Sequence, residues 1–515
     1  MAHSPNKLIP ASYDPAPSLQ LDPAVSAAAA PGGEATAVGY YVSTDGEVPG
    51  ELGLDRDSLA AAGFTGAAGS TLVLPREGST AVIAVGAGSG TVRTVDELRD
   101  GAAAFAAAAA RHEKLALVLP EGHGVAADAA AQASVEGALL ARYRFNALKS
   151  DPKTVAVAQL EIVGAGGGAG EGAGDGASEG AAAAAAGAAR GKVLARSAAL
   201  ARDLANNPPG HLTATEYADF ATEQGPAFGL SVETFGLAEL IEMGCGGLLG
   251  VNAGSVEEPR LIILRYVPES EPTAHLALVG KGIMYDSGGI SLKPSDPMHL
   301  AMKMDMAGSA AIMAAMTGLR DLGVTAAVSA WLVCTDNMPS GTATKLGDVL
   351  TARNGTTVEV KNTDAEGRLV MMDALSLAME ETPDAIVDAA TLTGAAMAAL
   401  GTLVGAVIGN DQPLVEQIKT AGAASGESIW QLPLEARYRK QLDSDVADIS
   451  NMGGPTAGAI TAALFLAEFV KGTPWAHLDI AGTMKSDSND SWRPTGATGY
   501  GTRLLSEFIV SYTKP

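Results

Sequence analysis

The sequence predicts an α/β protein of two domains, a smaller N-terminal α/β domain and a larger C-terminal catalytic domain with a mostly parallel central sheet flanked by helices. Three observations lead to this prediction. The chain has 515 residues, which is too long for one ordinary hydrophobic core. Short apolar segments alternate with Ala-rich segments of helical length in both halves of the chain. The apolar segments of the second half are nearly continuous, as in parallel strands that are covered on both faces.

The N-terminal domain is expected between residues 34 and 163. Residues 1–33, which are rich in Pro, Ala and Ser, are expected to form a mobile tail in front of it. We expect helices at 95–111 and 126–143, and strands at 71–74, 81–85, 115–119 and 154–158. This part of the chain contains no evident catalytic constellation.

A glycine-rich segment and a long helix are expected to join the two domains. From residue 164 to 180 roughly every second residue is glycine, so the segment buries too little apolar surface to offset its chain entropy and should be a flexible insertion. The Ala-rich stretch 181–206 carries Leu194, Leu200 and Leu204 and predicts a linking helix that ends before Pro208. The C-terminal catalytic domain then spans residues 207–515.

The C-terminal domain again alternates strands and helices. Its expected helices are 306–322, 368–381 and 457–470, and its expected strands are 261–267, 275–279, 327–334, 385–390 and 476–480. In open α/β sheets, ligands bind beyond the carboxyl ends of the strands. Segments 280–289, 391–394 and 481–484 follow three of these strands, so we expect the functional site there.

Composition excludes several classes of partner. A net charge of −24 argues against a surface that binds nucleic acid or anionic lipid. Cys245 and Cys334 stand far apart in apolar runs, which disfavours a disulfide scaffold and fits a reducing cytoplasm. The N-terminus lacks the pattern of a signal peptide. The uncharged segment between Asp388 and Asp411 is rich in Gly, Ala and Thr, so we expect a strand end and a buried helix rather than a membrane span.

The octapeptide 362–369 (Asn-Thr-Asp-Ala-Glu-Gly-Arg-Leu) is the most informative stretch for function. Asp364, Glu366 and Arg368 stand at alternate positions, and alternate side chains of an extended loop point the same way. Carboxylates that converge repel each other unless a cation lies between them. Upstream loops add further amines and carboxylates, namely Lys281, Asp286, Lys293 and Asp305. Together these residues predict a two-metal hydrolytic centre.

Three other interpretations of these loops are weaker. A phosphate loop at Lys281 is excluded because no Ser or Thr follows the lysine and His275 replaces the upstream glycine. A nucleophilic Ser287 would need the β-barrel and histidine base of serine proteases, which the pattern does not offer. The third interpretation is that these residues are only solvated loop charges, which is the usual case for a single Asp or Lys. Two lysines and four acids in two Gly-bearing loops favour a functional site.

The metal interpretation explains the residue types. Asp286 and Glu366 could each bridge two divalent ions about 3.5–4 Å apart, and water between such ions becomes a hydroxide nucleophile near neutral pH. Asp305 and Asp364 would each complete the ligands of a different ion. Oxygen-rich ligation suits Mn²⁺, Mg²⁺ or Zn²⁺. A lysine ligand must be neutral, and a nearby dication depresses its pKa enough to allow this.

The octapeptide and the segment 280–305 closely resemble the signature loops of the M17 leucyl aminopeptidase family, the cytosol aminopeptidases. The likeness runs from about Arg202 to Phe508, through 390–395 and 475–482, whereas the N-terminal domain resembles the family only in its α/β organisation. The loop 294–304 is one residue longer than is usual, and Met284-Tyr285 replaces the commoner Thr-Phe. The resemblance implies a two-metal-dependent aminopeptidase that releases N-terminal leucine and other apolar residues from peptides by a metal-activated water.

The resemblance also assigns residues and partners. One ion, Mn²⁺ or Zn²⁺, would be held by Lys281, Asp286, Asp305 and Glu366, and the other by Asp286, Glu366 and Asp364. Lys293 and Arg368 take the catalytic positions, with a bicarbonate ion at Arg368 as proton shuttle. The pocket for the first side chain of the substrate would be lined by Met302, Thr391, Leu392, Gly394, Ala481 and Met484. The family forms homohexamers, each a dimer of trimers with the catalytic domains at the centre.

Two competing functions remain open on the sequence. Some bacterial members of the family also bind DNA, but the charge of −24 and the lack of a Lys/Arg cluster in the N-terminal domain oppose this function. A metal-free scaffold is disfavoured because all the candidate ligands are present. We therefore expect a cytoplasmic enzyme that acts on peptides, with neither a membrane nor a nucleic-acid partner.

Overall fold

The computed structural model describes residues 9–10, 13–74, 80–90, 93–166 and 175–514. The chain divides into two units. The amino-terminal unit comprises residues 17–199 and 487–495, and the carboxy-terminal unit comprises residues 200–486 and 496–515 together with the described residues before 17. The division falls within α4 (Asp175–Asn206), so this helix contributes residues to both units.

The amino-terminal unit is built on a six-stranded sheet with the order β1-β6-β5-β2-β4-β3, in which only the β3–β4 pair is antiparallel. Leu117, Ile162 and other apolar residues of this sheet form one core with Phe105 and Val135 of two helices. These helices are α2 (Val95–Ala108) and α3 (Ala127–Arg142), and the short α1 (Arg56–Ala61) follows β2. The strands are β1 (Ala24–Ala28), β2 (Ala37–Ser43), β3 (Thr71–Leu74), β4 (Ala81–Gly88), β5 (Lys114–Val118) and β6 (Gln159–Val163).

Local sequence explains the two long helices of this unit. Thr94 and Glu97 form a capping box that satisfies the first N–H groups of α2. The two helices approach closely at Gly137, where a Cβ would lie 2.0 Å from the carbonyl oxygen of Arg99. Only glycine allows this approach.

Three predictions for this part of the chain differ from the structure. Residues 17–28, which we expected in a mobile tail, form η1 (Pro17–Gln20) and β1, because β1 pairs in parallel with β6. The predicted strand 154–158 is wrong. The strand is β6 at 159–163, since that segment alone pairs with both β1 and β5. Helix α4 begins at Asp175, inside the predicted flexible insertion, whose residues 167–174 lie outside the described part of the chain.

The carboxy-terminal unit contains an eight-stranded sheet with the order β15-β14-β17-β13-β9-β10-β8-β7. Its four central strands are parallel to each other, while β14 runs antiparallel to β17 and β8 runs antiparallel to both β10 and β7. This arrangement confirms the predicted mostly parallel sheet. The strands are β7 (Ser231–Phe235), β8 (Arg260–Tyr266), β9 (His275–Asp286), β10 (Ala327–Asn337), β13 (Ala385–Ala390), β14 (Gly405–Gly409), β15 (Ile429–Gln431) and β17 (Trp475–Asp479).

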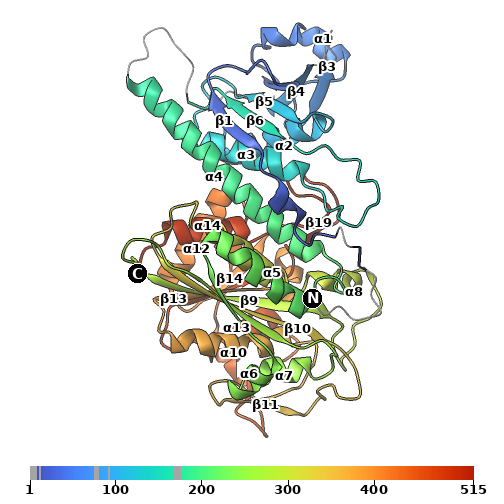
Figure 1. The fold of residues 1–515 in the computed structure, drawn as a ribbon, viewed down its shortest axis with the longest axis vertical. Helices are drawn as coiled ribbons and strands as arrows, with labels where there is room; N and C mark the ends of the chain where they lie inside the picture. The colour runs from blue at the N-terminus through green and yellow to red at the C-terminus, as the bar shows by residue number, and fades with distance from the viewer. Residues whose placement is uncertain (1–8, 11–12, 75–79, 91–92, 167–174, 515) are drawn as a thin grey trace. The chain divides into compact units, whose positions relative to one another are not determined.

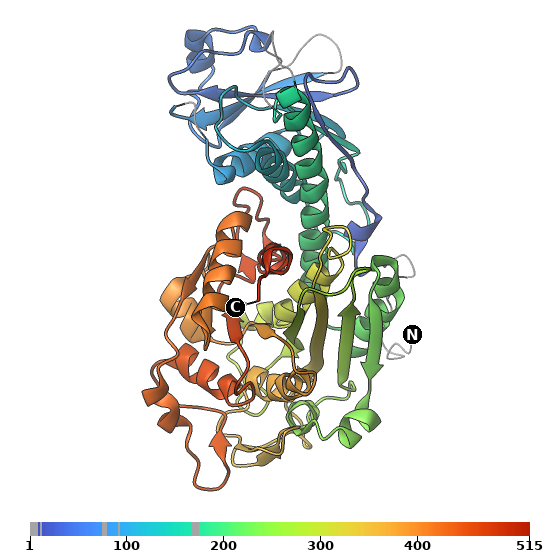
Figure 2. The ribbon, with the colours of Figure 1, turned by 90° about the vertical axis from the view of Figure 1, so that its left-hand side faces the viewer.

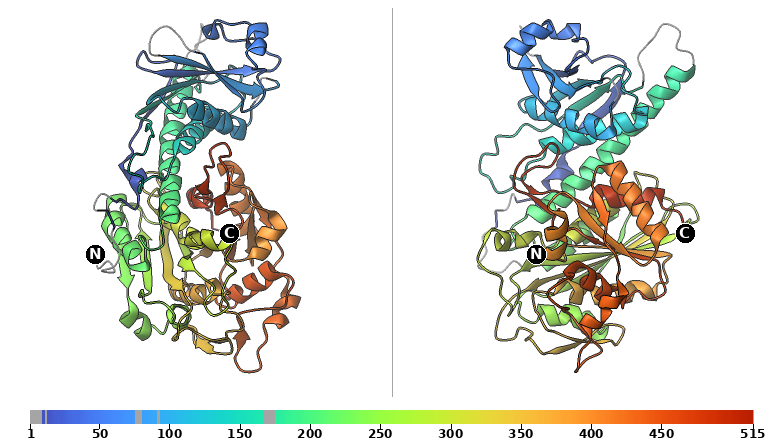
Figure 3. Two further views of the ribbon diagram at one scale, coloured as in Figure 1. Left: turned by 90° about the vertical axis from the view of Figure 1, so that its right-hand side faces the viewer. Right: turned by 180° about the vertical axis from the view of Figure 1, so that it is seen from behind.

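Helices cover both faces of this sheet (Figures 1, 2 and 3). On β9, Ala277, Val279 and Ile283 pack into one core with α10 (Gly367–Glu380) and α13 (Gly458–Ala467). Gly280 faces the other side, where a Cβ would lie 2.7 Å from the Cα of Ser309 in α9. The remaining helices are α5 (Ala214–Gln224), α6 (Leu237–Glu242), α7 (Gly246–Asn252), α8 (Pro297–Ala301), α9 (Ala307–Met316), α11 (Gly394–Leu400), α12 (Gln412–Ser425) and α14 (Thr502–Ser511).

Short strands complete this unit. They are β11 (Val349–Thr351), β12 (Thr357–Glu359) and β16 (Ile449–Ser450) in one small sheet, and β18 (Lys485–Ser486) and β19 (Gly496–Ala497) in another.

The uncharged segment between Asp388 and Asp411 contains the end of β13, the helix α11 and the strand β14. The helix, α11, buries only Ala396, so the predicted buried helix is wrong at this position. Ala396 packs into the core of the unit, whereas Gly394 and Ala395 on the same helix are exposed. Among the described residues, no helix combines the length and the apolar character that crossing a bilayer requires.

Candidate active site

The predicted charged residues of the octapeptide and of the upstream loop meet in the carboxy-terminal unit, where β9 and β10 end. Two lysines link them. Lys281 Nζ lies 2.7 Å from Asp305 Oδ2 and 2.8 Å from Glu366 Oε1. Lys293 Nζ lies 2.8 Å from Asp286 Oδ2 and 2.7 Å from Asp364 Oδ1. Two segments that are far apart in the chain, 281–305 and 364–366, thus form one polar cluster.

A β-bulge brings Lys281 and Asp286 to the same face of the sheet. Side chains of a regular strand alternate between faces, so positions 281 and 286 would point to opposite sides. The register of β9 against β10 shifts between the partners of Thr335 and Asp336, which leaves Met284 without a partner in β10. The extra residue reverses the alternation and turns Asp286 toward the carboxylates near Lys281.

Lys281 lies at the centre of the cluster. It is buried, and its ammonium also donates a hydrogen bond to the carbonyl of Thr391 at 2.8 Å. Burial alone lowers the pKa of Lys281, but the charges of Asp305, Glu366 and then Asp286 outweigh burial and raise it. Gly367 makes room for this side chain, because a Cβ there would lie 2.7 Å from Lys281 Cε.

Asp286 is fixed by three donors. Its Oδ1 accepts hydrogen bonds from the backbone N–H of Gly288 and from Asn337 Nδ2, both at 2.8 Å, while Oδ2 faces Lys293. Asn337 also donates to the carbonyl of Thr363 at 3.0 Å and so joins the two loops. Gly288 has φ +87°, and a Cβ there would lie 2.7 Å from Asp364 Oδ1. Both the backbone conformation and the space therefore require glycine.

The carboxylates have the properties of a cation site. Asp286, Asp305 and Glu366 are buried, and each offers an oxygen atom within 4.8 Å of the others. Burial, followed by the charge of Glu366, raises the pKa of Asp286, and burial raises the pKa of Asp305 well above its usual value. Glu366 Oε2 has no hydrogen-bond partner among the described residues. A divalent cation would satisfy this oxygen and remove the repulsion, so these residues fit a metal ion.

Lys293 and Asp364 occupy the more open side of the cluster, with 18% and 32% of their side chains exposed. Burial raises the pKa of Asp364, and the charge of Asp286 adds to this effect. Burial lowers the pKa of Lys293, but Asp286 and Asp364 outweigh burial and raise it. The ammonium of Lys293 is therefore held in its charged form next to the buried carboxylates.

Arg368, in the first turn of α10, is buried although it carries a charge. Burial lowers its pKa to about 10, while Glu366 and Asp479 act in the opposite direction. Its Nε and Nη1 atoms have no hydrogen-bond partner among the described residues. A guanidinium with free N–H groups in a buried setting is suited to binding a small anion.

The predicted substrate-binding residues lie on three segments around the cluster. Thr391 donates its hydroxyl to Asp305 Oδ1 at 2.7 Å. Met302, in η4 (Met302–Met304), and Met484 are buried. Leu392 and Ala481 are half-buried, and Gly394, which is exposed, has open space where a Cβ would be.

One residue that the sequence analysis missed connects two of these segments. The buried Asp479 accepts the N–H of Leu392 at 3.3 Å and that of Ala481 at 3.2 Å through Oδ1. Its Oδ2 accepts the hydroxyl of Thr393 at 2.6 Å. Asp479 and Asn337 are the last residues of β17 and β10. Ligands bind at the carboxyl ends of the strands in such sheets, so this position in the sequence could have identified both residues as part of the site.

Two domain families of known proteins match the chain. The catalytic domain of the cytosol aminopeptidase family matches residues 199–506, and the N-terminal domain of that family matches residues 53–152. The second match extends the likeness of the N-terminal domain beyond the shared α/β organisation that the sequence analysis found. The probable cytosol aminopeptidase of Roseiflexus castenholzii is 41% identical over 465 residues, which cover 89% of this chain and 93% of that protein. The corresponding protein of Streptomyces avermitilis is 42% identical over 495 residues, which cover 92% and 91%.

Two solved enzyme structures have a similar fold. The bottromycin maturation enzyme BotP in complex with Mn has a TM-score of 0.82 and 37% identity, covering 92% of this chain and 98% of that one. A tomato leucine aminopeptidase mutant has a TM-score of 0.82 and 28% identity, covering 95% and 97%. The chain therefore belongs to the cytosol aminopeptidase family, M17, and is a hydrolase of the metal-dependent aminopeptidase class.

Proposed function

We propose that this enzyme releases N-terminal amino acids from peptides, with a preference for leucine and other apolar residues, and that it uses two divalent metal ions per subunit. The observation that carries the proposal is the buried cluster of Asp286, Asp305 and Glu366, whose oxygen atoms lie within 4.8 Å of one another next to Lys281 and Lys293. Buried carboxylates at this spacing are costly unless cations lie between them.

The family resemblance divides the residues of this cluster into two ligand sets. Lys281, Asp286, Asp305 and Glu366 would hold one ion, and Asp286, Glu366 and Asp364 the other. Lys281 must lose its proton to act as a ligand, which a dication at this position promotes. Mn²⁺ and Zn²⁺ both suit these ligands, and the Mn in the similar BotP structure supports manganese. When bound, such a pair of ions supplies a nucleophile from water near neutral pH.

Lys293 and Arg368 would act on the reacting groups. Lys293 holds its ammonium beside Asp286 and Asp364, from which it can stabilise negative charge that develops on the scissile carbonyl. Arg368 has free N–H groups in a buried setting, which suits a bicarbonate ion that passes protons between water and the leaving amine. Arg368 would orient that ion.

The preference for apolar first residues would come from the loops after β13 and β17 and from η4. Their residues that would line the pocket are Met302, Thr391, Leu392, Gly394, Ala481 and Met484. Methionine side chains adapt to varied apolar groups. Recognition of the free α-amine at the cluster would restrict cleavage to the end of the peptide.

We propose further that residues 207–515 are the catalytic domain and 34–163 the N-terminal domain, and that the enzyme works in the cytoplasm as a homohexamer. Family resemblance supports the hexamer and the two domains. The use of only two cysteines, both buried and free, supports a reducing compartment.

An assay with leucine p-nitroanilide tests the proposal. The enzyme should lose activity after treatment with a chelator and regain it with Mn²⁺ or Zn²⁺. N-acetyl-leucine p-nitroanilide is the matched control, because its blocked amine should prevent cleavage. A panel of alanine, phenylalanine, arginine and aspartate p-nitroanilides measures the preference. Activity that persists unchanged in the presence of the chelator would exclude the metal mechanism. Faster turnover of the arginine or aspartate p-nitroanilide than of the leucine compound would exclude the apolar preference.

A further inference from the structure

The strand order of the amino-terminal sheet reverses at β2. Along the chain, β3 and β4 take places on one side of β2, whereas β5 and β6 lie on its other side. Because β2 runs parallel to both of its neighbours, β4 and β5, the carboxyl ends of these three strands meet at one edge of the sheet. In open α/β sheets, ligands bind at such an edge, where the strand order reverses. A ligand of this unit is therefore expected beyond the end of β2.

A cavity of about 570 Å³ lies at this edge, and we call it the sheet-edge cavity. Residues near the ends of the three strands contribute to its wall, among them Ser43 of β2, Ala87 of β4 and Val118 of β5. The loops after β2 and β5 add residues 46–51 and 119–121. The charged cluster of the candidate active site belongs to the other unit, so the sheet-edge cavity is a separate feature of the fold.

Arg93 is the buried cation of the sheet-edge cavity. It lines the cavity and is only 5% exposed. Its Nη1 and Nη2 atoms donate to the carbonyls of Ser89 and Gly90 at 3.1 and 2.6 Å. A guanidinium carries five N–H groups, so these two bonds leave three without an acceptor among the described residues, and the Nε–H is one of them. An anionic group in the cavity would accept hydrogen bonds from Arg93 and offset its buried charge.

Carboxylates also line the sheet-edge cavity. Glu47, Glu51 and Glu121 belong to its wall, and all three are exposed. Glu47 and Glu121 form no ion pair with any residue that the structure describes. Their charges attract a cationic group of a ligand and repel a second anionic group. The lining as a whole therefore matches a molecule that carries one anionic group and one cationic group.

The remaining wall of the sheet-edge cavity is apolar or aromatic. Tyr40, Val48 and Leu119 contribute to it. Tyr40 and Val48 are half-buried, so each still offers surface to a ligand. Apolar walls with a few polar groups that fix orientation are typical of small-molecule sites.

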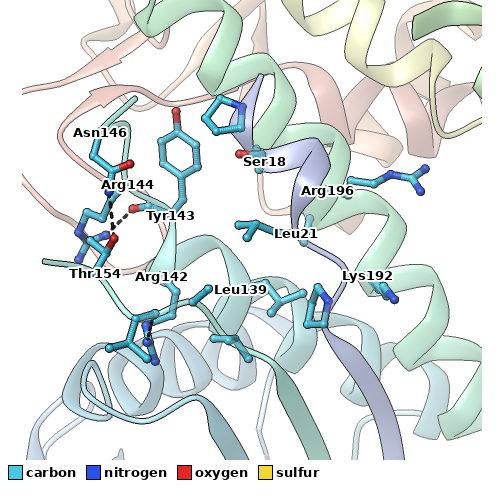
Figure 4. A pocket seen from close by; sticks show the side chains of 17 residues that line it. Ser18, Leu21, Leu139, Arg142, Tyr143, Arg144, Asn146, Thr154, Lys192 and Arg196 are labelled. Carbon is cyan, nitrogen blue, oxygen red and sulfur yellow. Dashed lines mark hydrogen bonds between the residues drawn. The ribbon is translucent and has the colours of Figure 1, made fainter. Parts of the chain in front are cut away.

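A second cavity of the amino-terminal unit, of about 230 Å³, lies beside α3 and α4 (Figure 4). It is also lined by cations, but these are satisfied within the chain. The terminal N–H groups of Arg142 all donate to backbone carbonyls, and Lys192 pairs with Asp22. These two cations leave little charge to select a ligand there, in contrast to Arg93 in the sheet-edge cavity.

We propose that the sheet-edge cavity binds a free α-amino acid with an apolar side chain. The carboxylate of the ligand would accept hydrogen bonds from Arg93, and its ammonium would donate to Glu47 and Glu121. Tyr40 and Val48 would contact its side chain. The cavity would thus take the class of molecule that the proposed function releases. Binding at this cavity goes beyond that function and does not require it.

Calorimetric titration of the full, metal-loaded chain with three matched probes tests the charge rule. The probes are L-leucine, 4-methylpentanoate, which lacks the amine, and 3-methylbutylamine, which lacks the carboxylate. At the cavity leucine should bind, and each analogue should bind at least about tenfold more weakly, because each lacks one charge-assisted hydrogen-bonding group.

The same titrations of Glu366→Ala, in which the metal cluster is disrupted, separate the cavity from the active site. Leucine should still bind to this variant. No binding of leucine at millimolar concentration, or binding of either analogue as tightly as leucine, would overturn the proposal.

Variants of the lining test the position of the site. Glu47 and Glu121 are exposed, so the double variant Glu47→Gln/Glu121→Gln should fold. It should bind leucine at least about tenfold more weakly. Glu113→Gln, which removes an exposed carboxylate outside the cavity, is the control and should bind leucine unchanged. Initial hydrolysis of leucine p-nitroanilide should stay unchanged in both proteins. Equal affinity for leucine in the double variant and in Glu113→Gln would overturn the proposal.

Discussion

At the scale of single residues, the candidate centre depends on how its carboxylates are shared. Asp286 and Glu366 belong to both proposed ligand sets, whereas Asp364 belongs to one. Asp286→Ala and Glu366→Ala should therefore lower the metal content at both positions and abolish activity, while Asp364→Ala should mainly empty one position. Elemental analysis of the purified variants checks this. Glu271→Ala, which removes an exposed carboxylate, should keep the full content. The same stoichiometry in all three site variants would contradict the assignment.

Lys293 should act on turnover rather than on metal binding. Its ammonium lies beside Asp286 and Asp364 on the more open side of the cluster. Loss of one preorganised donor typically costs ~10²–10³ in turnover, or roughly 3–4 kcal/mol. Lys293→Ala should retain its metals and nearly the same KM, with kcat reduced by about this factor. Steady-state kinetics and metal analysis measure both quantities. Loss of metal, or a raised KM with kcat near that of the unchanged enzyme, would assign the residue another role.

At the scale of elements, Asp373 of α10 joins three segments. Its two oxygens accept the backbone N–H groups of Leu248 in α7 and of Arg353 in the turn after β11, both at 2.9 Å. Burial raises the pKa of Asp373 from 3.8 to about 7, although these hydrogen bonds act to lower it. The carboxyl group is therefore protonated in the folded protein at pH values where the unfolded chain has released the proton.

This shift sets the sign of a pH effect on stability. Between the unfolded pKa of 3.8 and the folded pKa of about 7, the folded state binds more protons. The contribution of Asp373 to the free energy of unfolding therefore falls as pH rises and stays low above the folded pKa. Urea unfolding in the presence of chelator measures the free energy of unfolding at pH 5 and at pH 8. This free energy should fall less between the two pH values in Asp373→Asn than in the unchanged protein. The exposed Asp445→Asn is the control. An equal fall in the free energy of unfolding in all three proteins would contradict the raised pKa of Asp373.

At the scale of the whole molecule, we expect a homohexamer. The expectation rests on the family resemblance. Sedimentation velocity at micromolar concentration should give a particle six times the mass of one chain, which is 51.8 kDa. A single species at the monomer mass would rule the hexamer out.

The sequence by itself determined the fold class, most elements of the central sheet and the residue set of the candidate site. The predicted strand 385–390 coincides with β13, and 327–334 lies within β10. Long apolar runs and helical periodicity are local properties, so the sequence can report them. Asp364, Glu366 and Arg368 were evident for the same reason, because their chemistry is crowded into eight consecutive residues.

Only the tertiary structure decided what depends on contacts between distant segments. Strand β1 forms because β6 offers an edge for it, and the alternative strand at 154–158 fails because 159–163 takes the register with β5. The bulge in β9 turns Asp286 toward Lys281, while Asn337 and Asp479 gain their roles through hydrogen bonds to loops far away in the chain. Pairing, register and hydrogen bonding across the sheet are long-range interactions, and no window of neighbouring residues contains them.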